Sequence, residues 1–435
     1  MLLGAGPLVS CNNFPFWVGH HHTMIDAVSH YVGASAVSSH CGVSDGVLNT
    51  TTGKLDCAAA TSEFNASSVA AAAAMAGSAD AVILVVGNGV GLASEGHDAT
   101  NISFPDAQAQ LIQQVAAAAK KPVVVVTMTA SALDISSILS NPKVGAVLHA
   151  GEPAVSSLGA ADVLFGATVP AGRTIQTYVY SSGHPWPSEV SALLVSSRAV
   201  GVVQDIPSVL ARLDLDPGYG DAAGALLLPA PRLQRQGPRG DLPERDKSRT
   251  DSPVLCAASL ILFHENPDDC RCRTDTGTPT VPFGFGLSYT NFSYSISEAA
   301  GSVQLDRVDD LLAAHAGRPF PPQAATDSVG AVAQHKVTVT NTGSRDADHV
   351  VLGILKPPGA GQGGVPLQSL YDFARVHVRA GQSVTVALNA SALDFTLVDE
   401  AGQRAVLRGR YEFQFGIPET EPMGQGFAAR SVVAE

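Results

Sequence analysis

The chain has 435 residues, which is enough for two to four domains with sizeable hydrophobic cores. Charged residues make up only 15% of it, and the net charge of −13 does not suit a nucleic-acid backbone or an anionic membrane surface. No apolar run approaches the roughly 20 residues that span a bilayer. We therefore expect neither nucleic acid nor a membrane as a partner.

Sequons and cysteines point toward the secretory route. Five asparagines stand in Asn-x-Ser/Thr sequons, and the six cysteines are compatible with disulfides outside the cytosol. We expect an extracellular or secretory-pathway protein, although no signal peptide is visible in this chain. Cys41 with Cys57 is one pairing among fifteen. The glycosylation candidates are Asn49, Asn65, Asn291 and Asn389.

Helices and buried strands alternate through the first 180 residues. A helix is expected from Met24, with Thr23 as its N-cap, and an alanine-rich helix from Asn65. Apolar runs without alternation predict strands at 81–86, 123–127 and 144–149. Helices are expected at 132–139 and 155–165, and a further helix is expected to begin near Ser103, a candidate N-cap, and to end at Lys120-Lys121-Pro122. This order predicts an α/β fold with a mostly parallel sheet sandwiched by helices.

The second half of the chain divides into three further segments. Residues 181–275 are rich in proline and arginine and lack periodicity, so we expect an insertion or a disordered linker. A connector is expected at 276–330. From 331 to 420, alternating apolar runs separated by turn residues predict an all-β sandwich. The predicted domains are 1–60 as a partial N-terminal region, 61–180 as the α/β unit, and these three segments.

A glycine-rich loop follows the strand at 81–86 and carries Glu95. In open α/β sheets, loops at the carboxyl ends of strands form ligand sites, and a partly buried glutamate there can act as a general acid. A solvated loop glutamate is the alternative. The loop does not complete a dinucleotide fingerprint, because Leu92 occupies the third glycine position and the next helix begins too late to hold a phosphate. We expect no cofactor and no metal.

Several ordered motifs resemble glycoside hydrolase family 3, the β-glucosidases and β-xylosidases. The α/β-sandwich domain of that family is similar to ADAVILVVG, SEGHD, FPDAQAQLI, KPVVVV, NPKVGAVLHAG, GAADVLFG and PAGRT between residues 79 and 174. PFGFGLSYT at 282–290 looks like its connector, and the tail is similar to its fibronectin type III-like, immunoglobulin-type sandwich. The early cysteines and PAGRTIQT look more like the β-xylosidase branch.

The resemblance implies a retaining hydrolase acting on an oligosaccharide or aryl glycoside. The family's acid/base glutamate lies in a Glu-Gly-x-Asp-Arg pattern, so Glu95 is the catalytic candidate and Asp98 a substrate-side contact. The arginine of the pattern is replaced by Ala99. A glycan at Asn101, six residues from Glu95, would crowd the site, so we expect that sequon to be unoccupied.

One departure leaves an alternative function open. The family's nucleophile is an aspartate on a preceding TIM barrel, and no aspartate of this chain matches it. We therefore expect a β-xylosidase-like hydrolase, or a fragment of one that contributes the acid/base carboxylate and lacks the TIM barrel. The alternative is a catalytically inactive carbohydrate-binding or structural module.

Overall fold

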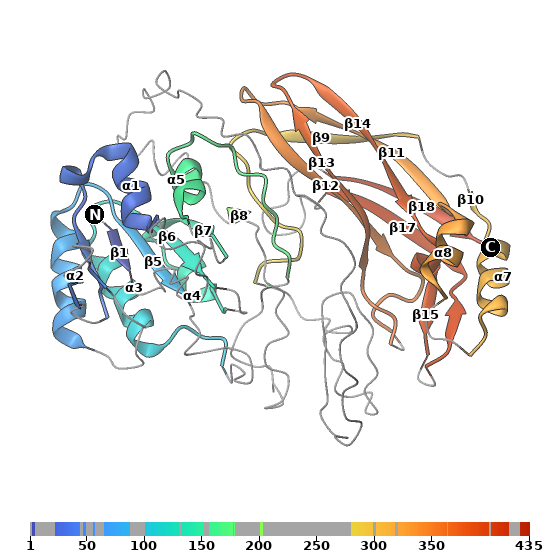
Figure 1. Ribbon diagram of the computed structural model, residues 1–435, viewed down its shortest axis with the longest axis horizontal. Coiled ribbons are helices and arrows are strands. Elements are labelled where there is room, and N and C mark those ends of the chain that lie inside the picture. The colour runs from blue at the N-terminus through green and yellow to red at the C-terminus, as the bar shows by residue number, and fades with distance from the viewer. Residues whose placement is uncertain are drawn as a thin grey trace, which may run out of the picture.

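The computed structural model describes most of two folded units, which lie side by side in Figure 1. It describes residues 2–4, 22–43, 47–48, 55–56, 65–87, 101–129, 133–151, 156–176, 178, 201–202, 280–298, 302–317, 321–362, 364–399, 402–416 and 427–435. The predicted linker 181–275 lies outside the described residues, apart from positions 201 and 202.

The first unit is an α/β layer structure. Its six-stranded sheet has the order β2-β1-β5-β6-β7-β8, and every pairing is parallel except that of β8 with β7. The elements are β1 (Leu2–Gly4), α1 (Met24–Val32), η2 (Ala34–Ala36), β2 (Ser39–His40), β3 (Val47–Leu48), β4 (Leu55–Asp56), α2 (Ala66–Ser78), β5 (Ile83–Gly87), α3 (Asp106–Ala118), β6 (Val123–Met128), α4 (Ser136–Leu139), β7 (Val144–His149), α5 (Leu158–Leu164) and β8 (Gly201–Val202).

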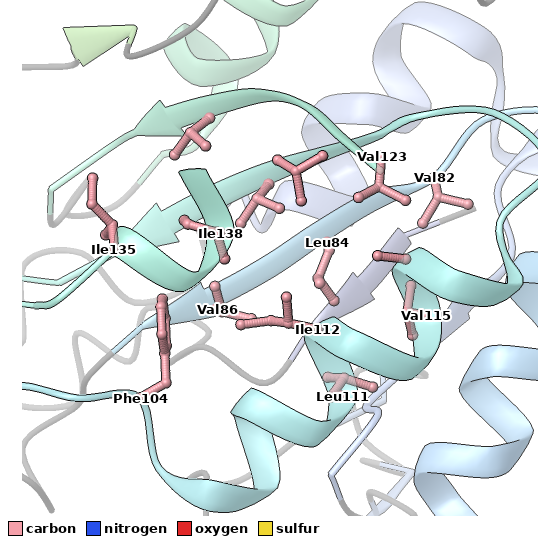
Figure 2. Packing of buried hydrophobic residues seen from close by; sticks show 14 of the residues in the cluster. Val82, Leu84, Val86, Phe104, Leu111, Ile112, Val115, Val123, Ile135 and Ile138 are labelled. Carbon is pink, nitrogen blue, oxygen red and sulfur yellow. The ribbon is translucent and has the colours of Figure 1, made fainter. Parts of the chain in front are cut away.

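Helices cover both faces of this sheet, as the sequence predicted. Leu84 and Val86 of β5 point toward α2, α3 and α4, and Figure 2 shows them beside Ile112, Val115 and Ile138. Val85, between them in the strand, joins the opposite core with residues of α1 and α5. Because both faces are buried, β5 is an apolar run without polar alternation, and β6 is apolar as far as Val126, the residue before Thr127.

Local capping sets the start of two helices. Thr23 and Asp26 form a capping box, in which the Thr23 hydroxyl accepts from the Asp26 amide and the Asp26 carboxylate accepts from the Thr23 amide. This confirms Thr23 as the N-cap of α1. The prediction of Ser103 as an N-cap was wrong: α3 begins at Asp106 behind Pro105. Proline lacks the amide that a helix start leaves unpaired, so it fits there without a side-chain cap.

The second unit is a β-sandwich of a five-stranded and a three-stranded sheet. Their orders are β10-β18-β17-β12-β13 and β14-β11-β9. The elements are β9 (Phe292–Glu298), β10 (Ser302–Val303), α7 (Asp306–Ala314), α8 (Gln323–Val329), β11 (Ala333–Asn341), β12 (Ala347–Lys356), β13 (Ser369–Val378), β14 (Ser383–Ala390), η4 (Ala392–Phe395), β15 (Thr396–Val398), β16 (Arg404–Val406), β17 (Gly409–Gly416) and β18 (Phe427–Ala434). Strands β9 and β18 carry the sandwich past both ends of the range 331–420.

A half-buried arginine joins the two units. Arg173, in the PAGRT motif, donates to the Gly286 carbonyl and, over 3.1 Å, to Nδ1 of His349 in β12. Burial and the Arg173 charge lower the pKa of His349 to about 2, so the ring is neutral. A guanidinium only donates, so His349 Nδ1 accepts and Nε2–H faces the Tyr294 oxygen at 2.5 Å. The orientation of the sandwich is thus tied to this motif.

A second histidine is buried in the sandwich core without a polar partner. His335 of β11 is fully buried against Phe413 and Phe415, and neither ring nitrogen has a hydrogen-bond partner among the described residues. Burial, and then the charge of Arg430, lower the pKa of His335 to about 4. The folded state therefore holds this ring neutral, whereas the unfolded chain protonates it below pH ~6.5.

This difference predicts how stability depends on pH. The contribution of His335 is fully present above pH ~6.5 and is lost as the pH falls toward 4. Between pH 7 and pH 5 the free energy of unfolding should fall by about 2 kcal/mol more in the wild type than in His335→Leu, because one pKa unit corresponds to about 1.36 kcal/mol. Urea unfolding at both pH values measures this. The exposed His22→Gln serves as control and should keep the wild-type loss. An equal loss in all three proteins would contradict the prediction.

Candidate active site

The two residues that the sequence assigns to the site, Glu95 and Asp98, lie outside the described residues. The structure does describe both ends of the segment that carries them. Gly87 is the last residue of β5, and Asn101 precedes helix α3. The site is therefore built here from the groups that hold these two ends and from the neighbouring strand ends.

Gln108 holds the first end of the segment. Its side chain is fully buried in α3, and its Oε1 accepts from the Gly87 amide over 3.0 Å while its Nε2 donates to the Gly87 carbonyl over 2.8 Å. One primary amide thus satisfies both polar groups of the glycine where the strand ends. A buried peptide group left without such partners costs about 1–3 kcal/mol, so this pairing fixes the point where the loop departs.

Gly87 also packs too closely on β6 to carry a side chain. A Cβ atom built on it would lie 1.7 Å from the Met128 carbonyl oxygen, and its φ angle is 156°. Only glycine allows the end of β5 to pair this closely with Met128. The first glycine of the predicted loop therefore has a steric role at the sheet edge.

The second end of the segment is held from the β6–α4 connection. The Ile102 carbonyl accepts from the Asp134 amide over 2.7 Å, and the Asp134 carboxylate accepts from the Ser136 amide at the start of α4. Asn101 is exposed, and its Oδ1 accepts from the Ser103 amide. Both ends of residues 88–100 are thus anchored beside the carboxyl ends of β5 and β6.

Two aromatic residues that the sequence analysis did not single out lie at the carboxyl end of β7, the strand that pairs with β6. His149 ends β7, and its Nδ1 lies 3.0 Å from the Thr127 hydroxyl, while its ring meets the Tyr178 ring edge-on. Burial lowers the pKa of His149 to about 4 and raises that of Tyr178 to about 12. Both rings are therefore uncharged at neutral pH. His149 could have been identified in the sequence as a polar residue at the end of an apolar strand. No feature of the sequence distinguishes Tyr178.

The described residues show neither a metal cluster nor a membrane helix. No group of three or more His, Cys, Asp or Glu side chains that could hold a metal ion occurs among them. Within the same residues, no helix is long and apolar enough to cross a bilayer. Cys41 is disulfide-bonded, whereas the other five cysteines lie outside the described ranges, so its pairing with Cys57 stays a prediction.

Comparison with known families decides what this unit is. Residues 8–202 match the glycosyl hydrolase family 3 C-terminal domain. The chain carries the C-terminal domain of glycosyl hydrolase family 3. Residues 349–417 match the fibronectin type III-like domain, so the sandwich is the second domain that the sequence predicted. The family 3 match includes Gly87, Gln108 and the segment with Glu95.

Curated relatives of this chain include xylosidases. It is 26% identical over 355 residues to beta-D-xylosidase 1 of Arabidopsis thaliana, covering 80% of the chain and 37% of that relative. It is 28% identical over 348 residues to a probable exo-1,4-beta-xylosidase of Aspergillus japonicus, covering 79% and 34%. The chain thus spans about a third of the length of these relatives.

Solved structures agree on the fold. A family 3 exo-beta-xylosidase in complex with a xylobiose aziridine probe is similar with a TM-score of 0.62 and 20% identity, over 100% of this chain and 44% of that one. The beta-D-glucoside glucohydrolase of Trichoderma reesei gives a TM-score of 0.56 and 20% identity, over 100% and 51%. Both support the α/β sheet followed by the β-sandwich.

Two glycines in the family 3 domain provide a matched test of the sheet edge. Gly87→Ala should lower the free energy of unfolding by about 3 kcal/mol or more, because the added methyl group meets the Met128 backbone. Gly159→Ala, in helix α5 with no atom within 4 Å of its Cβ position, should raise it by about 0.5–1 kcal/mol. Denaturant unfolding of both variants measures this. A Gly87→Ala variant as stable as the wild type would exclude the close approach.

Proposed function

We propose that the protein is a retaining glycoside hydrolase that acts on β-xylosides, with Glu95 as its acid/base carboxylate. The observation that carries the proposal is the Glu95-Gly96-His97-Asp98 motif within a family 3 domain, on a segment anchored at the carboxyl edge of the sheet. The xylosidase names of the curated relatives support the choice of sugar.

The proposed reaction has two steps that use Glu95 in opposite senses. A carboxylate nucleophile attacks the anomeric carbon while the protonated Glu95 gives its proton to the leaving oxygen, so the glycosidic bond breaks and a glycosyl-enzyme forms. The ionised Glu95 then takes a proton from water, whose oxygen attacks the same carbon and releases the sugar. We assign the nucleophile to no residue of this chain, and Asp98 to a contact with the substrate.

The anchored ends of residues 88–100 support a positioning role for Gln108. A general acid must lie within hydrogen-bond reach of the oxygen that it protonates, so its loop needs a fixed origin. The double hydrogen bond between Gln108 and Gly87, together with the Asp134–Ile102 bond, supplies such fixed points. At the carboxyl end of β7, His149 and Tyr178 add buried polar groups that carry no charge.

The alternative is a carbohydrate-binding or structural module without catalysis. The observation that favours it is the departure from the Glu-Gly-x-Asp-Arg pattern, in which Ala99 stands where the arginine is expected. The two functions differ in whether the purified chain turns over aryl glycosides or only binds sugar.

Substitution of Glu95 distinguishes an acid/base role from a structural one. With purified chain, Glu95→Ala should lower kcat by about 10²–10⁴-fold on aryl xylosides with poor leaving groups. The loss should be much smaller for dinitrophenyl xyloside, whose departure needs no proton. Azide should then restore turnover and give the β-xylosyl azide, because it attacks the glycosyl-enzyme without a base. Steady-state kinetics and product analysis measure these effects.

The matched control is Asp106→Asn, which removes an exposed carboxylate at the start of α3 and should leave kcat unchanged. Equal loss on both classes of leaving group in Glu95→Ala would remove Glu95 from proton transfer. Absence of turnover by the wild-type chain on aryl xylosides and aryl glucosides alike would contradict hydrolysis and favour the binding module. A glycan fully occupying Asn101 would also count against catalysis by Glu95.

A further inference from the structure

The three-stranded sheet of the β-sandwich exposes a face made mostly of serine and threonine side chains. Alternate residues of β9, β11 and β14 enter the core, and the others point outward. The outward positions are Ser293, Ser295, Ser297, Gln334, Lys336, Thr338, Thr340, Ser383, Thr385, Ala387 and Asn389. Thr338 bonds to Thr385, and Thr340 to Ser383, across the strands. We call this surface the hydroxyl face.

The hydroxyl face lacks what a protein interface needs. The largest apolar side chain on it is Ala387, whereas the centres of interfaces are enriched in large aromatic and apolar residues. The exposed large apolar side chains of the sandwich include Leu370 and Phe373, on β13 of the other sheet. The two sheets of the domain therefore offer solvent surfaces of different chemistry.

Two of the predicted sequons belong to this sheet. Asn389 lies on β14 in the hydroxyl face, and Asn291 immediately precedes β9, which pairs with the other edge of the central strand β11. Both side chains are exposed. The function proposed above uses neither residue.

The attachment atom is open at both positions. The Asn389 Oδ1 accepts from Gln334 Nε2 over 2.7 Å, and its Nδ2 has no partner among the described residues. The Asn291 side chain makes no hydrogen bond within those residues, and its carbonyl accepts from Thr342, which fixes the backbone beneath it. Asn65 differs, because its half-buried side chain caps α2 through the Ser68 amide.

A second observation concerns the compartment. Cys41 is disulfide-bonded, and structural disulfides persist in the oxidising environment where N-glycosylation also takes place. A glycan on an exposed asparagine is bulky and hydrophilic, and it fits a hydroxyl-rich surface that carries no large apolar side chain. We propose that Asn291 and Asn389 carry N-linked glycans, which cover the hydroxyl face and leave the opposite sheet of the sandwich uncovered.

The test is a glycopeptide map of the chain secreted from a eukaryotic host behind a cleavable signal. Peptides are treated with an amidase that releases N-glycans in H₂¹⁸O, so that each occupied asparagine becomes an ¹⁸O-labelled aspartate. The expected result is label at both Asn291 and Asn389. Secreted protein with either position unlabelled would overturn the proposal, whatever the state of Asn49 or Asn65.

Matched variants separate the sequon from the fold. Ser293→Ala removes the Asn291 sequon, and Ser295→Ala removes an exposed serine two residues further along the same strand but outside any sequon. The first should lose one glycan by intact mass, and the second should lose none. Asn389→Gln should likewise lose one glycan. Loss in Ser295→Ala, or none in Ser293→Ala, would contradict the assignment, and occupancy of Asn101 bears only on the proposed catalysis.

Discussion

A single buried amide, Gln108, determines where the candidate catalytic loop leaves the sheet. It pairs with both the amide and the carbonyl of Gly87, at the point where β5 meets Met128 of β6 too closely for any side chain. The geometry joins three elements, β5, β6 and α3, in one contact. Because none of its polar groups reaches water, breaking the contact leaves unsatisfied donors and acceptors, which makes the departure point of the loop well defined.

A chain of contacts links this sheet edge to the fibronectin type III-like domain. Thr174 pairs with Phe285 and Gly284 of the connector, and Tyr178 pairs with Val281 while its ring packs on His149. Arg173, one residue before Thr174, reaches His349 in the sandwich. The connector is thus held between both domains. At its start the connector pairs with Tyr178, whose ring packs on His149 at the end of β7. Strand β7 pairs with β6, which in turn pairs with β5.

Buried strands were predictable because their signal is local. The runs at 123–127 and 144–149 coincide with β6 and β7 to within one residue, since a strand buried on both faces is apolar over most of its length. Thr23 was predictable for the same reason, because its cap partner lies three residues away. Gly87 could not be explained from its sequence neighbours, because the backbone that excludes a side chain there belongs to Met128, 41 positions along the chain.

Residues whose partners are distant in sequence could not be predicted. Gln108 stands on a helix as an ordinary polar residue, and only the fold brings it to Gly87. His335 occupies an inward position of β11, where alternation predicts an apolar side chain. Glu95 and Asp98 were assigned by resemblance and stay predictions. The sequence therefore predicted the strand after which the candidate segment begins, but not the groups that hold the two ends of that segment.

Hydrogen exchange at the Gly87 amide tests this account most directly. In the wild type we expect protection comparable to that of the Val125 amide in the middle of β6, because Gln108 Oε1 accepts the proton in a buried contact. In Gln108→Leu the Gly87 amide should exchange rapidly while Val125 stays protected, which shows that the sheet itself is intact. Rapid exchange of Gly87 in the wild type, or unchanged protection in the variant, would contradict the anchoring of the loop by Gln108.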